Sequence, residues 1–284
     1  MKYIDLHVHS TVSDGTLSPT ELVDHAVKLG LSAFALTDHD TIRGVAEAKK
    51  RAAWHTSQGR PIEVYSGVEI SAGYKNRDIH ILGLLINEHD EILDRILTNF
   101  LENRNRRNER MLEKFAEHGI ELTMEDLTEG AESAVITRAH FATALMKKGL
   151  VSSVQEAFEK YVGDNAPCYI PREFMSPEQA ISSIKKAGGV PVLAHPLLYN
   201  LPHDELYALV ERLKKAGLKG LEVYYSTNHG QDEVNVKALA NHFGLVATGG
   251  SDFHGSVKPH IELGIGKGNL KIPYSVLENV LAVK

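Results

Sequence analysis

The sequence predicts an α/β protein in which seven parallel strands form a closed or nearly closed barrel. Two observations predict this fold. Short apolar segments, often β-branched, recur seven times along the chain, and helical patterns alternate with them. This alternation favours a parallel sheet, because each helix returns the chain to the start of the next strand. The expected strands cover residues 3–8, 33–37, 63–68, 79–86, 190–195, 220–225 and 245–250.

Two of the expected helices begin with the same signal. Ser18 and Ser176 each stand before a proline at the first helical position, with Glu21 or Gln179 three residues after the serine. A serine cap with an acidic or amide side chain three residues later is typical of a capping box. Further helices are expected over residues 42–57, 203–216, 231–242 and 274–282.

The segment 91–174 breaks the alternation, because it contains helical patterns and no good strand. Its longest amphipathic pattern begins at Ile92, and two shorter patterns follow. We therefore expect a helical insertion domain at 91–174 that covers the mouth of a discontinuous barrel formed by 1–90 and 175–284.

The composition predicts a cytoplasmic protein without a membrane or duplex DNA as partner. The net charge is −6, which does not favour general nucleic-acid or membrane binding. No apolar run approaches the roughly 18 residues that span a membrane, and the N-terminus lacks the apolar stretch of a signal peptide. Cys168 is the only cysteine, which excludes an internal disulfide framework.

Histidines and acids gather at the ends of the expected strands. In "DLHVHSTVSDG" (5–15), His7 and His9 end the first strand and Asp14 follows in the loop. Residues two apart on a strand point the same way, and the C-terminal ends of barrel strands open on one face. The other candidates at such ends are His39, Glu69, His195, Asp252 and His254, whereas His80 stands at the start of the fourth strand.

Neutral imidazole combined with carboxylate suits Mn, Fe(II) or Zn, and the candidate set is too large for one ion. We therefore expect two or three ions with a bridging carboxylate. A single histidine at a strand end is more often a hydrogen-bonded residue than a ligand, so the argument depends on the joint placement. Asp5 is expected to support the site, Asp38 and Asp40 could cap the following helix, and Glu222 could pair with a cation at the edge of the core.

At these residues the sequence resembles the PHP family (polymerase and histidinol phosphatase domain) of metal-dependent phosphoesterases. The resemblance covers roughly 1–90 and 175–284 and rests on "DLHVHSTVSDG", "LTDHDT", "GVEI", "AHP" and "GSDFH". It implies a distorted seven-stranded, TIM-like (β/α)7 barrel with three divalent metal ions. By the family motifs, the ligands would be His7, His9, Glu69 and Asp252 for the first ion, Glu69, His80 and His195 for the second, and Asp14, His39 and His254 for the third.

Within this family, the segment "TRAHFA" in a helical insertion resembles the members that act on nucleotides. The resemblance implies hydrolysis of the 3′-phosphate of nucleoside 3′,5′-bisphosphates, or action on short 5′-phosphorylated oligoribonucleotides. In this hypothesis a metal-bridging hydroxide attacks phosphorus at a catalytic centre that includes Asp252. His229 is a candidate to protonate the leaving alkoxide, with a metal-bound water as the alternative.

A substrate with two phosphates needs a second cationic pocket. Arg138 and Arg172 flank the insertion, and the planar guanidinium suits phosphate, although a surface ion pair is the alternative for each. Three other functions stay open: a phosphatase of the histidinol-phosphate type, a metal-dependent amidohydrolase and a catalytically silent nucleotide sensor. The complete ligand set argues against the sensor.

Overall fold

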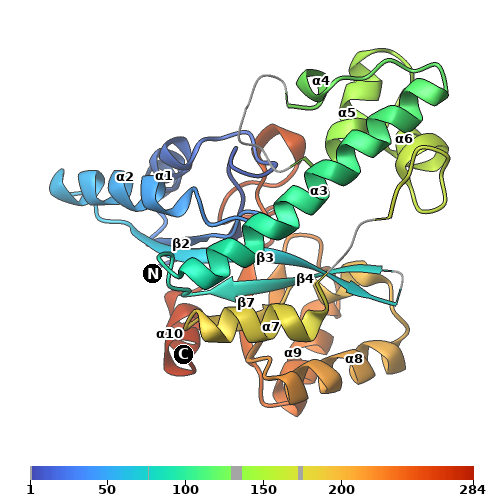
Figure 1. The fold of residues 1–284 in the computed structure, drawn as a ribbon. Helices are drawn as coiled ribbons and strands as arrows, with labels where there is room; N and C mark the ends of the chain where they lie inside the picture. Colours follow the sequence, from blue (N-terminus) through green and yellow to red (C-terminus); the bar gives the residue numbers. More distant parts are fainter. Residues whose placement is uncertain (1, 76, 129–135, 172–174) are drawn as a thin grey trace. The chain divides into compact units, whose positions relative to one another are not determined.

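A computed structural model describes residues 2–75, 77–128, 136–171 and 175–284 (Figure 1). Its strands form one seven-stranded sheet in the order of the sequence. The strands are β1(Ile4–Val8), β2(Ala33–Leu36), β3(Glu63–Tyr74), β4(Arg77–Leu84), β5(Val190–Leu193), β6(Gly220–Tyr225) and β7(Val246–Gly250). The predicted α/β fold and the position of every predicted strand are confirmed, with shifts at the strand ends.

The direction of β4 differs from the prediction. The pairs β1–β2, β2–β3, β5–β6 and β6–β7 are parallel, but β4 is antiparallel to both β3 and β5. Only residues 75 and 76 separate β3 from β4, whereas a parallel crossover needs about a dozen residues or more. Because β4 runs backwards, its start lies at the same edge of the sheet as the end of β3.

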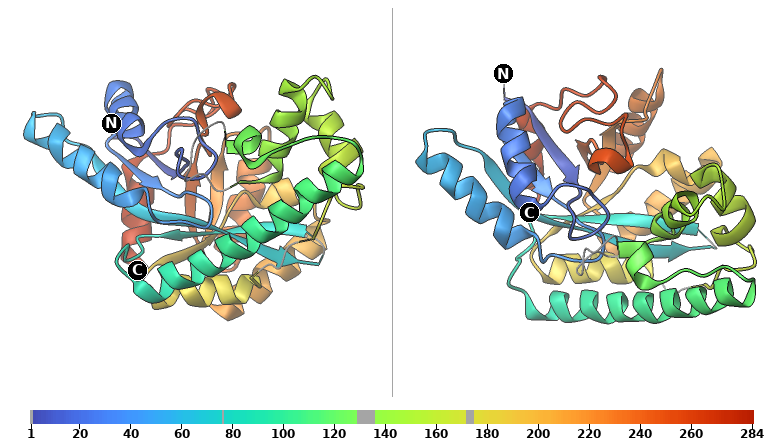
Figure 2. Two further views of the ribbon diagram at one scale, coloured as in Figure 1. Left: turned by 45° about the horizontal axis from the view of Figure 1, so that its top comes forward. Right: turned by 90° about the horizontal axis from the view of Figure 1, so that it is seen from above.

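The first and last strands of the sheet, β1 and β7, approach each other at their C-terminal ends (Figure 2). The backbone N–H of His9 donates to the carbonyl of Phe253 at 3.0 Å, and the N–H of Asp252 donates to the carbonyl of His7 at 2.9 Å. Val8 and Phe253 form a parallel bridge at this point. The sheet is therefore a nearly closed barrel, and its closure places the segment after β7 beside the end of β1.

The helices of the barrel follow the predicted alternation. Ser18 and Ser176 form the predicted capping boxes with Glu21 and Gln179. Phe34 and Leu36 of β2 pack with Leu22 and Ala48 in a buried cluster between the sheet and the first two helices. The helices are α1(Pro19–Leu29), α2(Val45–Ser57), α7(Pro177–Lys186), α8(His203–Ala216), α9(Asp232–His242) and α10(Tyr274–Ala282), with short 3₁₀ helices η2(Pro196–Tyr199) and η3(Gly255–Val257).

The chain divides into two compact units, one of Met1–Ile96 with Phe174–Lys284 and one of Leu97–Glu173. The second unit is helical and has its own core, in which Phe115 and Phe141 stack with ring centroids 5.8 Å apart. Its helices are most of α3(Glu91–Glu117), then α4(Met124–Thr128), α5(Arg138–Lys147), α6(Val154–Ala157) and the π-helical turn η1(Phe158–Val162). No helix in the described ranges is long and apolar enough to cross a membrane.

Candidate metal centre

The C-terminal ends of the parallel strands and the start of β4 supply one cluster of histidines and carboxylates. His7 and His9 lie two residues apart at the end of β1, and their ring centroids are 5.1 Å apart. His80 lies near the start of β4, where Ser71 of β3 is its partner in the antiparallel register. Glu69 is therefore diagonal to His80 across the hairpin, within reach of a long side chain. His80, which looked like an exception in the sequence, thus joins the other candidates.

The first group of side chains contains His7, His9, Glu69 and Asp252, which are all buried. The Oε2 atom of Glu69 lies 3.2 Å from the Nε2 atoms of both His7 and His9. The Oδ1 atom of Asp252 lies 3.5 Å and 3.3 Å from the same two nitrogens. One ligand atom from each residue lies within 4.8 Å of all the others, so the four side chains enclose a space suited to one ion.

A second group forms around the other oxygen of Glu69. Its Oε1 atom lies 2.9 Å from Nδ1 of His80 and 3.0 Å from Nε2 of His195, and these two nitrogens are 3.3 Å apart. His39 approaches the same carboxylate, with its Nδ1 atom 3.1 Å from Oε2. Glu69 therefore presents one oxygen to each of two adjoining groups, as a bridging carboxylate does.

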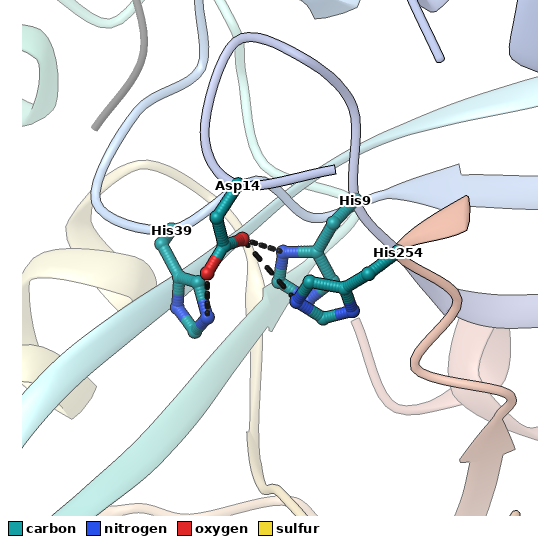
Figure 3. A group of neighbouring side chains, drawn as sticks. All are labelled: His9, Asp14, His39 and His254. Carbon is teal, nitrogen blue, oxygen red and sulfur yellow. Dashed lines mark ion pairs between the residues drawn. The ribbon is translucent and has the colours of Figure 1, made fainter. Parts of the chain in front are cut away.

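The third group surrounds Asp14 (Figure 3). Its Oδ1 atom lies 3.2 Å from Nε2 of His254 and 3.7 Å from Nδ1 of His9, and its Oδ2 atom lies 3.7 Å from Nε2 of His39. The rings of His9 and His254 stack with centroids 4.1 Å apart. The sequence prediction placed His9 in the first group alone, whereas the structure places one of its nitrogens in each of two groups.

Several buried polar atoms of these groups support ion binding. Within the described residues, no hydrogen-bond partner exists for the atoms His7 Nε2, His9 Nδ1, His9 Nε2, Asp14 Oδ1, His39 Nδ1 and His195 Nδ1. A buried polar atom without a partner is costly, and native proteins rarely leave one. A divalent ion would satisfy such atoms, and a donor set of imidazole and carboxylate fits Mn, Fe or Zn. The residues present therefore fit the expected metal.

Burial and the neighbouring carboxylates shift the pKa values of the histidines in this cluster in opposite directions. Burial lowers the pKa of His9, but the carboxylates of Asp252 and Glu69 outweigh burial and raise it to about 9. Burial also opposes the charge on His7, yet Glu69 and Glu222 hold its pKa well above the usual range. Burial lowers the pKa of His39 to about 3, against the attraction of Glu69 and Asp14. Burial likewise opposes the charge on His80, but Glu69 outweighs burial and raises its pKa. Without a metal ion, the charge therefore falls on His7, His9 and His80 and not on His39.

Glu222 is a positioning residue that the sequence did not identify as such. This buried carboxylate on β6 lies with Oε1 3.0 Å from Nδ1 of His7, and its Oε2 accepts the backbone N–H of His195 at 2.7 Å. A histidine ligand commonly donates its second ring N–H to a carboxylate, which fixes the tautomer. The available signal was an acid within the apolar strand "GLEVYY". The sequence analysis expected a cation at the edge of the core as the partner of Glu222, whereas its partner is His7 inside the cluster.

Asp252 has a second set of partners that the sequence did not predict. Its Oδ2 atom accepts the hydroxyl of Tyr225 at 2.6 Å and lies 2.6 Å from Nζ of Lys258. Tyr225 ends β6, and Lys258 follows η3. The sequence offers no pattern that would pair Lys258 with a residue six positions earlier, because the contact depends on the path of that loop.

Three other acidic side chains accept hydrogen bonds from residues in or near the loops around the site. Asp5 accepts the backbone N–H groups of Ser251 and Gly264 at 2.9 and 2.8 Å, which agrees with the expected supporting role. Asp38 accepts the backbone N–H and hydroxyl of Ser10, both at 2.7 Å. Asp40 accepts the backbone N–H of Ser71 at 2.9 Å. The idea that Asp38 or Asp40 caps the next helix is wrong, because α2 begins after Gly44 without a side-chain cap.

The remaining candidates stand apart from these groups. None of the metal-binding groups found among the described residues includes His229, which is 89% exposed and lies 3.2 Å from Asp232 at the start of α9. Arg138 belongs to the helical unit, where its Nη1 atom lies 2.8 Å from Oδ1 of Asp164. Arg172 lies outside the described residues.

Comparison with known proteins agrees with this geometry. The model of the PHP domain matches residues 5–175. The chain is 36% identical to the 5′-3′ exoribonuclease Rnm of Escherichia coli over 92% of this chain and 87% of that protein. It is also 36% identical to the 3′,5′-nucleoside bisphosphate phosphatase of Chromobacterium violaceum, over 89% of this chain and 88% of that protein.

A solved structure extends the likeness to the whole fold. A Bifidobacterium adolescentis protein assigned as a metal-dependent phosphoesterase superposes with a TM-score of 0.83 at 32% identity, covering 99% of this chain and 96% of that chain. The seven-stranded barrel, the converging histidines and carboxylates and these likenesses lead to one assignment. The chain belongs to the PHP domain family and is a metal-dependent phosphoester hydrolase.

Proposed function

We propose that this protein binds three divalent ions, of Mn, Fe or Zn, and hydrolyses the 3′-phosphate of nucleoside 3′,5′-bisphosphates. The observation that carries the proposal is the placement of Glu69, whose two oxygens face two adjoining groups of ligand-type side chains. Bridged ions are the usual arrangement for hydrolysis of phosphate esters. The likeness to a 3′,5′-nucleoside bisphosphate phosphatase supports this substrate class.

In this proposal Glu69 is shared by two ions, and every other ligand serves one ion. Neutral imidazole has one lone pair, so His9 serves one ion although its two nitrogens face two groups. Its Nε2 atom, 3.2 Å from Glu69 Oε2, would bind, and its Nδ1–H would point to Asp14. The assigned ligands are His7, His9, Glu69 and Asp252 for the first ion, Glu69, His80 and His195 for the second, and Asp14, His39 and His254 for the third.

When bound, divalent ions supply water of lowered pKa and neutralise charge on the phosphoryl oxygens. The protein's own residues provide the orientation. Glu222 holds Nδ1 of His7, so Nε2 of that ring faces Glu69 and Asp252. Tyr225 and Lys258 hold the outer oxygen of Asp252. Every one of these groups except Lys258 is buried, which limits solvent around the ligands and strengthens their electrostatic interactions.

The second phosphate of the substrate requires cations outside the ligand groups, and we assign Arg138 and Arg172 to it. The guanidinium of Arg138 lies 5.2 Å from the ring centroid of Tyr169 and pairs with Asp164 at 2.8 Å. This partly exposed ion pair is a weak interaction that a phosphate can replace, because phosphate accepts two parallel N–H bonds from arginine.

His229 is assigned to protonation of the leaving alkoxide. Its side chain is 89% exposed and pairs with Asp232 at 3.2 Å, and in this proposal it leaves that exposed ion pair to reach a bound nucleotide. A general acid matters most for a poor leaving group. His229→Ala should slow the hydrolysis of the nucleotide and leave the hydrolysis of 4-nitrophenyl phosphate unchanged. If the substitution changes the rates on both substrates by the same factor, or changes neither, another group donates the proton.

A 5′-3′ exoribonuclease is the second candidate function, because a relative of 36% identity carries that name. The deciding experiment measures phosphate release by metal-quantified protein from adenosine 3′,5′-bisphosphate, histidinol phosphate and a 5′-phosphorylated oligoribonucleotide. The proposal expects the highest kcat/KM for the bisphosphate. Mononucleotide release from the oligonucleotide at a higher kcat/KM would establish the exonuclease, and nucleotide binding without turnover would establish a sensor.

A further inference from the structure

A second cluster of charged and aromatic side chains lies at the other end of the barrel from the metal groups. Helix α2 starts after the C-terminal end of β2 and finishes before the start of β3, and α1 finishes before the start of β2. The last turns of both helices therefore lie at the N-terminal ends of the strands. Asp24 joins the two helices, because its carboxylate accepts Nε and Nη2 of Arg51 at 2.6 and 2.9 Å. Figure 1 shows α1 and α2 in blue at this side of the sheet.

A surface pocket of about 440 Å³ opens between these helix ends. Its wall includes Lys28, Arg51 and Arg60 together with the rings of Trp54 and His55. An adjoining pocket of about 350 Å³ shares Val27 and Arg60 and adds Lys2 and the carboxylate of Glu63. The two pockets therefore adjoin, and four cations and two carboxylates, Asp24 and Glu63, line this hollow.

Three of these cations are not neutralised. The Asp24 carboxylate compensates Arg51, but Lys2, Lys28 and Arg60 form no ion pair with any carboxylate in the part of the chain that the structure describes. All three side chains are exposed. In a chain of net charge −6, such a concentration of positive charge would attract an anion to this place.

An exposed indole lies among the cations. Trp54 is 43% exposed, which is unusual for so large an apolar side chain. The Cζ atoms of Arg51 and Arg60 lie 4.0 and 5.7 Å from the centre of its ring. Beside it, His55 is buried, and its Nδ1 atom has no hydrogen-bond partner among the described residues. Exposed aromatic rings with flanking cations are a common platform for nucleobases and phosphates.

We propose that this hollow is a second, non-catalytic binding site for a nucleotide. Lys28 and Arg60 would bind the phosphate, because guanidinium and ammonium groups without a carboxylate partner retain their full hydrogen-bonding capacity for it. The exposed part of the Trp54 ring would contact the base. The site shares no residue with the metal groups, so it stands independently of the substrate proposed above.

Trp54 is the only tryptophan of the chain, so its fluorescence reports directly on binding at this hollow. The experiment titrates metal-loaded protein with adenosine 5′-monophosphate and follows indole fluorescence, excited at the red edge where adenine does not absorb. Calorimetry of the same titration provides an independent affinity. We expect a saturable fluorescence change that weakens with added salt, since the binding cations are exposed.

Charge reversal at the exposed cations tests the assignment. Lys28→Glu with Arg60→Glu should raise the Kd at least about tenfold, and Arg60→Gln should have a smaller effect in the same direction. Lys186→Glu, an exposed charge reversal on α7, is the matched control and should leave the Kd unchanged. The proposal is wrong if no saturable change occurs or if the double variant, folded by circular dichroism, responds like the parent. Equal affinity for inorganic phosphate or ribose 5-phosphate would also overturn it, since no base would then be recognised.

Discussion

Lys258 holds the oxygen of Asp252 that faces away from the histidine cluster. Nζ lies 2.6 Å from Oδ2, and the hydroxyl of Tyr225 donates to the same oxygen at 2.6 Å. The other oxygen, Oδ1, lies 3.3 Å from Nε2 of His9. Two donors occupy the lone pairs of Oδ2, so Asp252 has one oxygen available for an ion. Burial favours the neutral acid, but Lys258 and His7 hold the pKa of Asp252 well below its usual range.

Lys258→Met should therefore weaken metal binding without removing a ligand. The carboxylate of Asp252 would lose one partner and rotate, and loss of such an orienting partner commonly lowers metal affinity 10- to 100-fold, as an order of magnitude. Equilibrium dialysis with metal analysis measures this directly. Lys267→Met replaces an exposed lysine in a later loop and serves as the control. Equal metal affinity in both variants would contradict a positioning role for Lys258.

Glu222→Gln tests the orientation of His7. The amide keeps the size of the side chain, but it replaces one of the two carboxylate oxygens with an NH2 donor. Because His7 Nδ1 and the backbone N–H of His195 face different oxygens of Glu222, one of the two loses its acceptor. We expect a 10- to 100-fold loss of metal affinity, as an order of magnitude, with far-UV circular dichroism unchanged. Glu233→Gln, an exposed acid on α9, should bind metal like the parent. Normal affinity in Glu222→Gln would show that packing alone orients His7.

Much of the site could be predicted because its ligands follow strand ends, and strands are visible as apolar segments. His80 does not follow this rule, because it lies near the start of its strand and not at the end. Its strand reads like the others, and only the two-residue connection from Tyr74 to Arg77 reveals that it runs backwards. The contacts of Lys258 and Glu222 with the cluster were not predictable, because they depend on the path of a loop and on the closure of the barrel.

Metal loading should release protons. Burial lowers the pKa of His9, yet Asp252 and Glu69 raise it to about 9, so the ring is protonated at pH 7 in the metal-free protein. An imidazole must be neutral to bind an ion. Titration of metal-free protein with Zn²⁺ in weakly buffered solution should release about one or more protons per protein at pH 7, and affinity should fall as the pH falls. Loading at pH 7 without proton release would show that His9 is already neutral.

Glu88 should contribute a stability that depends on acid pH. Burial raises its pKa, but Lys49 and Ser66 outweigh burial and lower it from 4.5 to about 2. Because the folded pKa is depressed, the stabilisation is present above about pH 4.5 and is lost as the pH falls toward 2. Glu88→Gln should lower the free energy of unfolding by on the order of 1 to 2 kcal/mol at pH 7 and by much less at pH 3.

Urea unfolding of chelator-treated protein at the two pH values measures the Glu88 effect without interference from bound metal. Glu233→Gln provides the comparison, because its carboxylate is exposed on α9. A deficit of the same size at both pH values would mean that the Glu88 carboxylate stabilises the fold through packing and not through its charge.

Arg138 provides the test of the bisphosphate substrate. Its guanidinium pairs with Asp164 at 2.8 Å, and a charge-assisted bond to phosphate contributes about 1.5 to 3 kcal/mol. Arg138→Ala should therefore reduce kcat/KM for adenosine 3′,5′-bisphosphate by about 10- to 100-fold while sparing 4-nitrophenyl phosphate, which has no second phosphate. Asp164→Asn removes the competing carboxylate and should keep or improve activity on the bisphosphate. If Arg138 has only a structural role, Asp164→Asn will lower activity as Arg138→Ala does, and both substrates will be affected equally.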